Sequence, residues 1–292
     1  METTYRNTKL SAKNALMLTK RHQLEKVLVE AEGGKASSPV SFREYLDRIL
    51  VAPRADLGLE HLHQMGVLKE HIPEVEALVG FGGGHEGHKD LWDHVKQVVV
   101  QTPKENHLRW AALFHDVGKP RCFKKVEGKV SFHGHEAISA RLWVKFCRRS
   151  RLFNQEFAED VEFLVKHLGH VESYEPSWTD SAVRRTLREV GAHFLDLVIL
   201  SRADMSTSDP TKRARNQRRI DELVERATLL SLADLRSKPR KGLSLELSAA
   251  LGIAPGPDLG KVMKAVIGAV ESGILAVNAP VEEYVRWVRR QV

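Results

Sequence analysis

The 292-residue sequence lacks several features that would place it in a specialised class of protein. It contains only two cysteines, Cys122 and Cys147, which are too few for a disulfide framework and lack the CxxC spacing of a zinc site. No run of 18 apolar residues is present, so no transmembrane helix is expected. The first residues lack the apolar core of a signal peptide. These absences predict a cytoplasmic protein that does not enter the membrane.

The sequence also lacks a succession of long alternating strands or βαβ units, which excludes the common α/β folds. Apolar residues instead recur at helical spacing, and Gly or Pro often follows them. A small hairpin is expected between residues 121 and 132, with its turn at Glu127-Gly128. Helices are predicted over residues 12–32, 41–50, 57–66, 91–101, 108–114, 133–149, 154–168, 178–190 and 193–205, from 210 onwards, and up to 270. Ser41 and Asn154 are the expected N-caps of two of these helices, and the second is expected to end around Leu168-Gly169. The fold class is therefore mainly α.

Acidic residues are outnumbered, and the formal net charge is +7. This balance favours a polyanionic partner such as a nucleotide or nucleic acid, although many cytoplasmic proteins are mildly basic without one. Basic residues gather in Lys212-Arg213-Ala214-Arg215-Asn216-Gln217-Arg218-Arg219, and Arg148, Arg149 and Arg151 add to them. Such a surface suits contact with the backbone of an RNA such as tRNA, or is simply a solvated helix face.

A glycine-rich segment over residues 80–90 contains His88. It lacks the Gly-Lys-Ser/Thr ending of a phosphate-binding P-loop and follows no predicted strand. We interpret it as a flexible active-site loop.

The most informative motif is Phe114-His115-Asp116-Val117-Gly118-Lys119. An apolar helix over residues 108–114 leads directly into His115 and Asp116, and Gly118 and Pro120 then end it. A buried imidazole and a buried carboxylate cost free energy unless they are paired, and a divalent cation is a good partner for both. The motif therefore raises the question of further ligands.

Other metal-competent side chains occur on successive predicted helices. Asp204 follows the apolar run Leu197-Val198-Ile199-Leu200, where a carboxylate needs a cation or a hydrogen-bond partner. A single histidine on such a helix is usually a core or surface residue. The whole series, in order, indicates a metal centre: His94, His115, Asp116, His135, His167 and Asp204.

This order, H…HD…H…H…D, resembles the HD superfamily of metal-dependent phosphohydrolases. The sequence is most similar to the HD region of bacterial CCA-adding tRNA nucleotidyltransferases, over about residues 41–275. The segments that carry the similarity are residues 87–94, 111–120, 132–136, 182–185, 201–204 and 255–257, with Gly260. The resemblance implies an HD-domain helical bundle with an additional C-terminal helical segment. It divides the chain into an N-terminal helix and linker (1–40), an HD phosphohydrolase domain (41–236) and the C-terminal segment (237–292).

The sequence departs from those enzymes in one respect. Their nucleotidyltransferase head has no counterpart here, because forty residues before the HD region are too few to hold it, and CCA addition is not expected. The resemblance implies a phosphohydrolase for phosphomonoesters, nucleotides or 2′,3′-cyclic phosphates, including RNA ends. Two other functions stay open, a non-catalytic RNA- or tRNA-binding module and a hydrolase of signalling nucleotides unrelated to RNA.

By the same resemblance, His94, His115, Asp116 and Asp204 would ligate one metal. His135 and His167 match the additional ligands of two-metal HD proteins, in which Asp116 would bridge the ions. Mixed imidazole and carboxylate ligation suits Mn²⁺, Fe²⁺, Ni²⁺ or Co²⁺, and also allows Mg²⁺. One or two such cations would activate a water near neutral pH.

Several further residues are candidates for contact with the substrate. Lys119 would bind a substrate phosphate as a point charge, and Arg184 and Arg185 would clamp it bidentately. His88 and His133 are candidates for metal ligation or for proton transfer to the leaving group. For the lysine and the arginines, a solvated surface position is the alternative.

Overall fold

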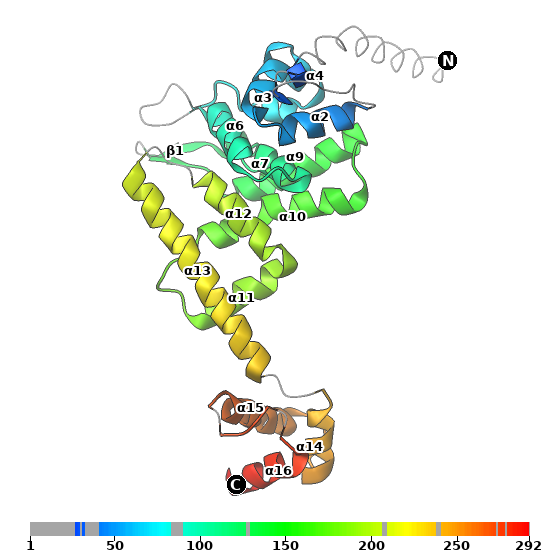
Figure 1. Ribbon diagram of the computed structural model, residues 1–292, viewed down its shortest axis with the longest axis vertical. Helices are drawn as coiled ribbons and strands as arrows, with labels where there is room; N and C mark the ends of the chain where they lie inside the picture. The colour runs from blue at the N-terminus through cyan, green and yellow to red at the C-terminus, as the bar shows by residue number, and fades with distance from the viewer. Residues whose placement is uncertain are drawn as a thin grey trace, which may run out of the picture. The chain divides into compact units, whose positions relative to one another are not determined.

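The computed structural model describes residues 27–29, 31–32, 41–82, 90–126, 129–205, 209–237, 241–272, 274–277 and 279–291. Helices dominate this part of the chain, and its one sheet has two strands (Figure 1). The prediction of a mainly α fold is therefore confirmed. Of the described helices, none is long and apolar enough to span a membrane.

The chain forms two compact units, which are described separately. The first unit combines Met1–Glu175 with Arg188–Ile220, and the second combines Pro176–Leu187 with Asp221–Val292.

The first unit begins with a group of short helices. Ser41 caps the first of them, because its hydroxyl accepts a hydrogen bond from the Glu44 N–H at 3.1 Å, as the sequence predicted. Gly66 separates two of the helices in a left-handed conformation with φ of 69°. The helices are α2 (Phe42–Val51), α3 (Ala55–Gln64), α4 (Val67–His71) and α5 (Pro73–Glu76). The predicted helix over 12–32 lies mostly outside the described residues, although 27–29 and 31–32 are helical.

The central helix of this unit is α7 (Asn106–Phe114), in which every residue from Leu108 onwards is buried. A helix that is apolar on all sides is typical of a core position. It packs against α2 and against four other helices: α6 (Leu91–Gln101), α9 (His135–Ser150), α10 (Gln155–Glu172) and α12 (Phe194–Asp204). The end of α7 therefore reaches the middle of the unit.

Aromatic side chains join α7 to α9. The ring centroids of Phe114 and Trp143 are 4.9 Å apart, and those of Trp110 and Phe146 are 5.9 Å apart. Such pairs each contribute about 1 kcal/mol beyond the area that they bury. The contacts hold the two helices in a fixed register.

Between α7 and α9 lie α8 (Lys119–Cys122) and a small hairpin. Its strands, β1 (Lys124–Val126) and β2 (Lys129–Ser131), are antiparallel, with Lys124 opposite Ser131. The strands of the predicted hairpin are confirmed, whereas the turn at 127–128 lies outside the described residues.

One predicted boundary is wrong. The Asn154 cap of α10 is confirmed, since its side chain accepts from the Phe157 N–H at 3.0 Å. The helix does not end at 168–169, however, but continues to Glu172. Gly169 serves close packing rather than termination, because a Cβ there would lie 3.0 Å from Glu136 Oε1.

The predicted C-terminal helical segment is confirmed. It consists of α14 (Leu243–Leu251), α15 (Pro257–Glu271) and α16 (Val281–Gln291), which share their own apolar core. The Tyr284 hydroxyl at its centre lies 2.6 Å and 2.7 Å from the carbonyl oxygens of Ala276 and Val277. The remaining helices, α11 (Asp180–Val190), the 3₁₀ turn η1 (Gly191–His193) and α13 (Pro210–Ser237), connect the segments of the two units.

Candidate metal centre

Four metal-competent side chains meet in the first unit, and we call them the His-Asp cluster: His94, His115, Asp116 and Asp204. His94 Nε2 lies 2.8 Å from Asp204 Oδ1 and 3.4 Å from His115 Nε2. His115 Nε2 lies 3.3 Å from both Asp116 Oδ2 and Asp204 Oδ1. His94, His115 and Asp116 offer ligand atoms that all lie within 4.8 Å of one another. This spacing is small enough for one cation.

Local sequence explains why these side chains point inward. His94 lies on α6 next to a buried stripe that includes Trp92 and Val95. Asp204 lies on α12 at helical spacing from Leu197, Leu200 and Ser201, all of them buried. His115 and Asp116 follow the buried helix α7, and the Asp116 side chain is 1 % exposed. Three separate helices thus supply the cluster.

Backbone carbonyls fix the tautomers of the histidines. Nδ1 of His115 lies 2.7 Å from the carbonyl oxygen of Ala112, and Nδ1 of His135 lies 3.0 Å from that of Phe132. Because a carbonyl only accepts, Nδ1 carries a proton in each ring, and Nε2 is the nitrogen that faces Asp116 and would present its lone pair to a cation. Metal-binding histidines are commonly oriented in this way.

The electrostatics of the cluster follow from its burial and its charges. Burial alone raises the pKa of Asp116, but the positive charges of His115 and Lys119 hold that pKa well below its usual value. Burial lowers the pKa of His115, yet the charges of Asp116 and Asp204 outweigh it and raise the pKa well above the ordinary value. The pKa of Asp204 is lowered mainly by His115, against the effect of burial. Asp116 and Asp204 are therefore both ionised, and their negative charges attract a cation to the cluster.

The donor set fits a divalent cation. Asp116 Oδ1 is buried and has no hydrogen-bond partner among the described residues; His135 Nε2 is 3.4 Å away. An unsatisfied carboxylate oxygen in a protein interior needs a partner such as an ion. Two imidazoles and two carboxylates are typical ligands of first-row transition metals.

Lys119 contacts the cluster directly. Its Nζ donates to Asp116 Oδ2 at 2.6 Å and lies 5.7 Å from the centre of the Phe132 ring. Burial lowers the pKa of Lys119, but the charge of Asp116 outweighs this and raises it. Lys119 thus places a positive charge beside Asp116, while its contact with a substrate phosphate stays a prediction.

The two additional histidines lie in different surroundings. His135, the first residue of α9, faces Asp116. His167 Nδ1 donates to the Phe163 carbonyl at 2.9 Å, and the His167 ring lies 4.1 Å from that of Phe163 and 5.1 Å from that of His170. Burial lowers the pKa of His167. Ligation of a second metal by His135 and His167 stays a prediction.

The other predicted substrate contacts are spread over the chain. His133 is exposed in the turn before α9, and His88 lies outside the described residues. On α11, Arg184 is half-buried and Arg185 is exposed. Their roles also stay predictions.

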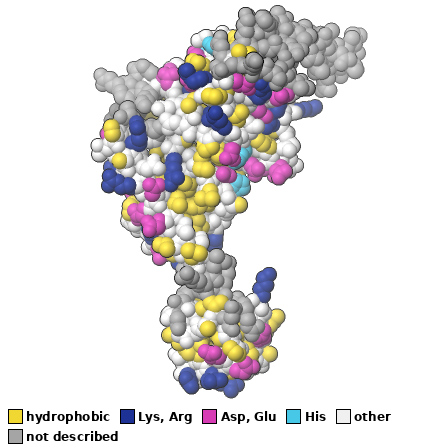
Figure 2. All heavy atoms as spheres, in the orientation of Figure 1, with side chains coloured by type: hydrophobic (Ala, Val, Ile, Leu, Met, Phe, Trp, Pro, Cys, Tyr) yellow, Lys and Arg dark blue, Asp and Glu magenta, His cyan; other side chains and the backbone are white. Residues whose placement is uncertain are grey.

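The predicted basic surface includes arginines that pair with acids. Arg149 forms two hydrogen bonds with Glu74, at 2.6 Å and 2.8 Å, and Arg219 lies 3.1 Å from Glu175. On the face shown in Figure 2, Lys and Arg side chains are scattered among Asp and Glu. Among the described residues on that face, Lys and Arg side chains form no single continuous patch.

Sequence reasoning missed one residue of the site, Glu172. Its pKa is raised well above the usual value by burial and by the charge of Asp204, to which it is hydrogen-bonded. A protonated Glu172 can donate to Asp204, whereas an ionised Glu172 would repel it. The available signal was its position four residues after Leu168 and seven after Val165, on the buried stripe of α10.

Comparison with known proteins agrees with this geometry. The family model described as "HD domain" matches residues 88–236, which is half of the chain. An A-adding tRNA nucleotidyltransferase of Deinococcus radiodurans is 27 % identical over 275 residues, covering 90 % of this chain and 62 % of the relative. A CC-adding tRNA nucleotidyltransferase of Thermus thermophilus is 31 % identical over 240 residues, covering 79 % and 52 %. This chain thus spans between half and two thirds of the length of these relatives.

Proposed function

Because the chain belongs to the HD domain family, we propose that it is a metal-dependent phosphohydrolase acting on phosphate esters of nucleotides or RNA ends. The observation that carries the proposal is the His-Asp cluster, in which Asp116 Oδ1 is buried without a hydrogen-bond partner among the described residues. A phosphate ester suits such a site because a cation there can neutralise phosphoryl oxygens.

The four residues of the cluster would bind the metal, and two neighbouring residues would have separate roles. His94, His115, Asp116 and Asp204 would hold a divalent cation such as Mn²⁺, Ni²⁺, Co²⁺, Fe²⁺ or Mg²⁺. That cation would supply a nucleophile from water near neutral pH. Lys119 would move from Asp116 to a phosphate oxygen, because both partners are anionic and the Nζ is flexible. Glu172 would keep Asp204 in place through its hydrogen bond.

The proposal is tested with metal analysis and hydrolysis of 2′,3′-cyclic AMP and p-nitrophenyl phosphate. The parent is compared with Asp116→Asn and with Asp93→Asn, a matched change at an exposed position of α6. We expect Asp116→Asn to lose bound metal and at least about a hundredfold in rate, and Asp93→Asn to retain both. Equal rates in the parent and Asp116→Asn, or no metal bound by the parent, would contradict the proposal.

A second candidate is a tRNA-binding module without turnover. It is supported by the names of the relatives, which are nucleotidyltransferases acting on tRNA. Binding and hydrolysis of a tRNA, measured beside hydrolysis of 2′,3′-cyclic AMP and p-nitrophenyl phosphate, separate the binding module from the hydrolase. Tight tRNA binding without hydrolysis of any substrate would favour the module.

A further inference from the structure

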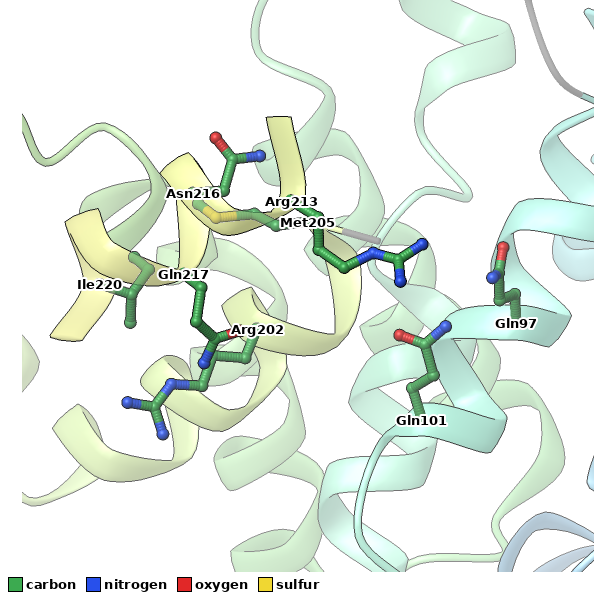
Figure 3. A pocket seen from close by; sticks show the side chains of 8 residues that line it. All are labelled: Gln97, Gln101, Arg202, Met205, Arg213, Asn216, Gln217 and Ile220. Carbon is green, nitrogen blue, oxygen red and sulfur yellow. The ribbon is translucent and has the colours of Figure 1, made fainter. Parts of the chain in front are cut away.

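The first unit contains a pocket of about 350 Å³ among α6, α12 and α13 (Figure 3). Figure 3 shows the guanidinium of Arg213 extending from α13 toward Gln97 and Gln101 on α6. Ligand sites in proteins typically measure roughly 300 to 1,000 Å³, so this pocket suits a ligand of mononucleotide size rather than a folded RNA. Its lining consists of Gln97, Gln101, Arg202, Met205, Arg213, Asn216, Gln217 and Ile220.

The chemistry of the lining is specific. Four of the eight residues are carboxamides, each with an acceptor oxygen and two N–H donors, which match the mixed donor and acceptor edges of a nucleobase. Arg202 and Arg213 add two positive charges, and no carboxylate is among the eight. Met205 and Ile220 provide apolar surface against which a flat ring can pack. A ligand with an anionic group attached to a polar planar ring would use the carboxamides, the positive charges and the apolar surface.

The pocket shares two helices with the His-Asp cluster. Gln97 follows His94 by three residues on α6, a rise of about 4.5 Å along the helix. Met205 directly follows Asp204 at the end of α12. A ligand in the pocket is thus held by the same helices that carry two of the candidate metal ligands.

We infer that this pocket binds one nucleotide unit of the substrate, its base against carboxamides of the lining and its phosphate against Arg213. As a substrate subsite, this inference rests on the proposed function. It predicts a preference for substrates that carry a base over simple phosphate esters. A phosphate alone would use the positive charge of the pocket but leave Gln97, Gln101, Asn216 and Gln217 without a role.

The test is calorimetric binding of AMP, GMP, CMP and UMP to the full chain in EDTA, with ribose 5-phosphate and inorganic phosphate as probes that lack a base. We expect the preferred nucleotide to bind at least about tenfold more tightly than ribose 5-phosphate. Arg213→Met and Gln101→Leu should each weaken its binding about tenfold. The matched controls, Arg141→Met on α9 and Gln155→Leu on α10, change exposed residues outside the pocket and should leave it unchanged.

Two outcomes would overturn the inference. One is equal affinity for the nucleotides and ribose 5-phosphate. The other is an affinity that Arg213→Met and Gln101→Leu leave unchanged while circular dichroism shows them folded. Because the measurement is made without metal, it is separate from the hydrolysis test. Loss of the proposed function with retained nucleotide binding would leave a nucleotide-binding pocket in a protein that does not hydrolyse phosphate esters.

Discussion

Gly118 occupies a position that has no room for a side chain. A Cβ there would lie 2.3 Å from the carbonyl oxygen of His135 and 2.8 Å from the Ser139 nitrogen. Its own N–H donates to Ser139 Oγ at 2.8 Å. This close approach brings the turn after Asp116 against the start of α9, and therefore sets the position of His135 relative to Asp116.

We predict that Gly118→Ala lowers the free energy of unfolding by about 2 kcal/mol or more, because backbone atoms must move to admit the methyl group. The measurement is urea unfolding followed by tryptophan fluorescence. The control is Gly260→Ala, since a Cβ at Gly260 would meet nothing within 4 Å. That change in a helix should cost nothing, or stabilise slightly. An equal effect of the two substitutions would contradict the close-packing role of Gly118.

A second residue-scale prediction concerns Cys147. Burial raises the pKa of its thiol to about 12, from an ordinary value of 9.0. The thiolate is the reactive form, so Cys147 should resist iodoacetamide at pH 8 in the folded protein and react after unfolding. The experiment uses a Cys122→Ser variant, in which Cys147 is the remaining cysteine that iodoacetamide can alkylate. Rapid alkylation of the native protein would refute the prediction.

The same shift has a consequence for stability. Between pH 9 and pH 12 the unfolded chain releases the Cys147 proton while the folded protein keeps it. The unfolded state then binds fewer protons, so the contribution of this group to stability is complete below pH 9 and falls as the pH rises above it.

At the scale of the helices, Arg109 joins the ends of α2 and α6 to the loop that follows α6. It is 3 % exposed, and its guanidinium donates to the carbonyl oxygens of Leu50, Val100 and Pro103 at 3.0 Å, 3.3 Å and 3.0 Å. Leu50 and Val100 lie in the last turns of α2 and α6, where carbonyls have no partner within the helix. Burial lowers the pKa of Arg109 to about 10, so it stays charged at neutral pH.

We predict that Arg109→Met destabilises the first unit by about 3 kcal/mol, because three carbonyls, that of Leu50 in a buried hydrogen bond, lose a charged donor. Arg141→Met, at an exposed position, should change stability by less than about 0.5 kcal/mol. Urea denaturation of both variants tests this. If the two stabilities agree, Arg109 does not hold the helix ends together.

At the scale of the whole molecule, the His-Asp cluster belongs to one unit and the C-terminal helices have a separate core. We therefore predict that Mn²⁺ raises only the thermal transition of the first unit. At a hundred times the dissociation constant, the gain in its free energy of unfolding is about 2.7 kcal/mol.

Calorimetry with and without MnCl₂ measures this shift. The Asp204→Asn variant is the control, and its first transition should no longer respond to the metal. An equal shift in both transitions, or a shift that persists in Asp204→Asn, would argue against a metal bound at the cluster.

Much of the fold could be predicted from local sequence. The cap at Ser41, the cap at Asn154 and the helix over 91–101 agree with the structure, because capping and apolar periodicity depend on neighbours within a few residues. The choice of His94, His115, Asp116 and Asp204 rested on the same kind of signal, a polar group in a buried helical pattern. The structure brings these four together, and their role as metal ligands stays a prediction.

Other features depended on contacts between residues distant in sequence. Gly169 was predicted to end its helix. It lies within α10 instead, where the lack of a side chain leaves space for Glu136 of α9. Glu172 joins the site because α10 packs against α12. The sequence alone determined most of the longer helices and the metal-competent residues they carry. Only tertiary structure decided which of those residues meet, because burial and pairing arise from helix packing that no local pattern encodes.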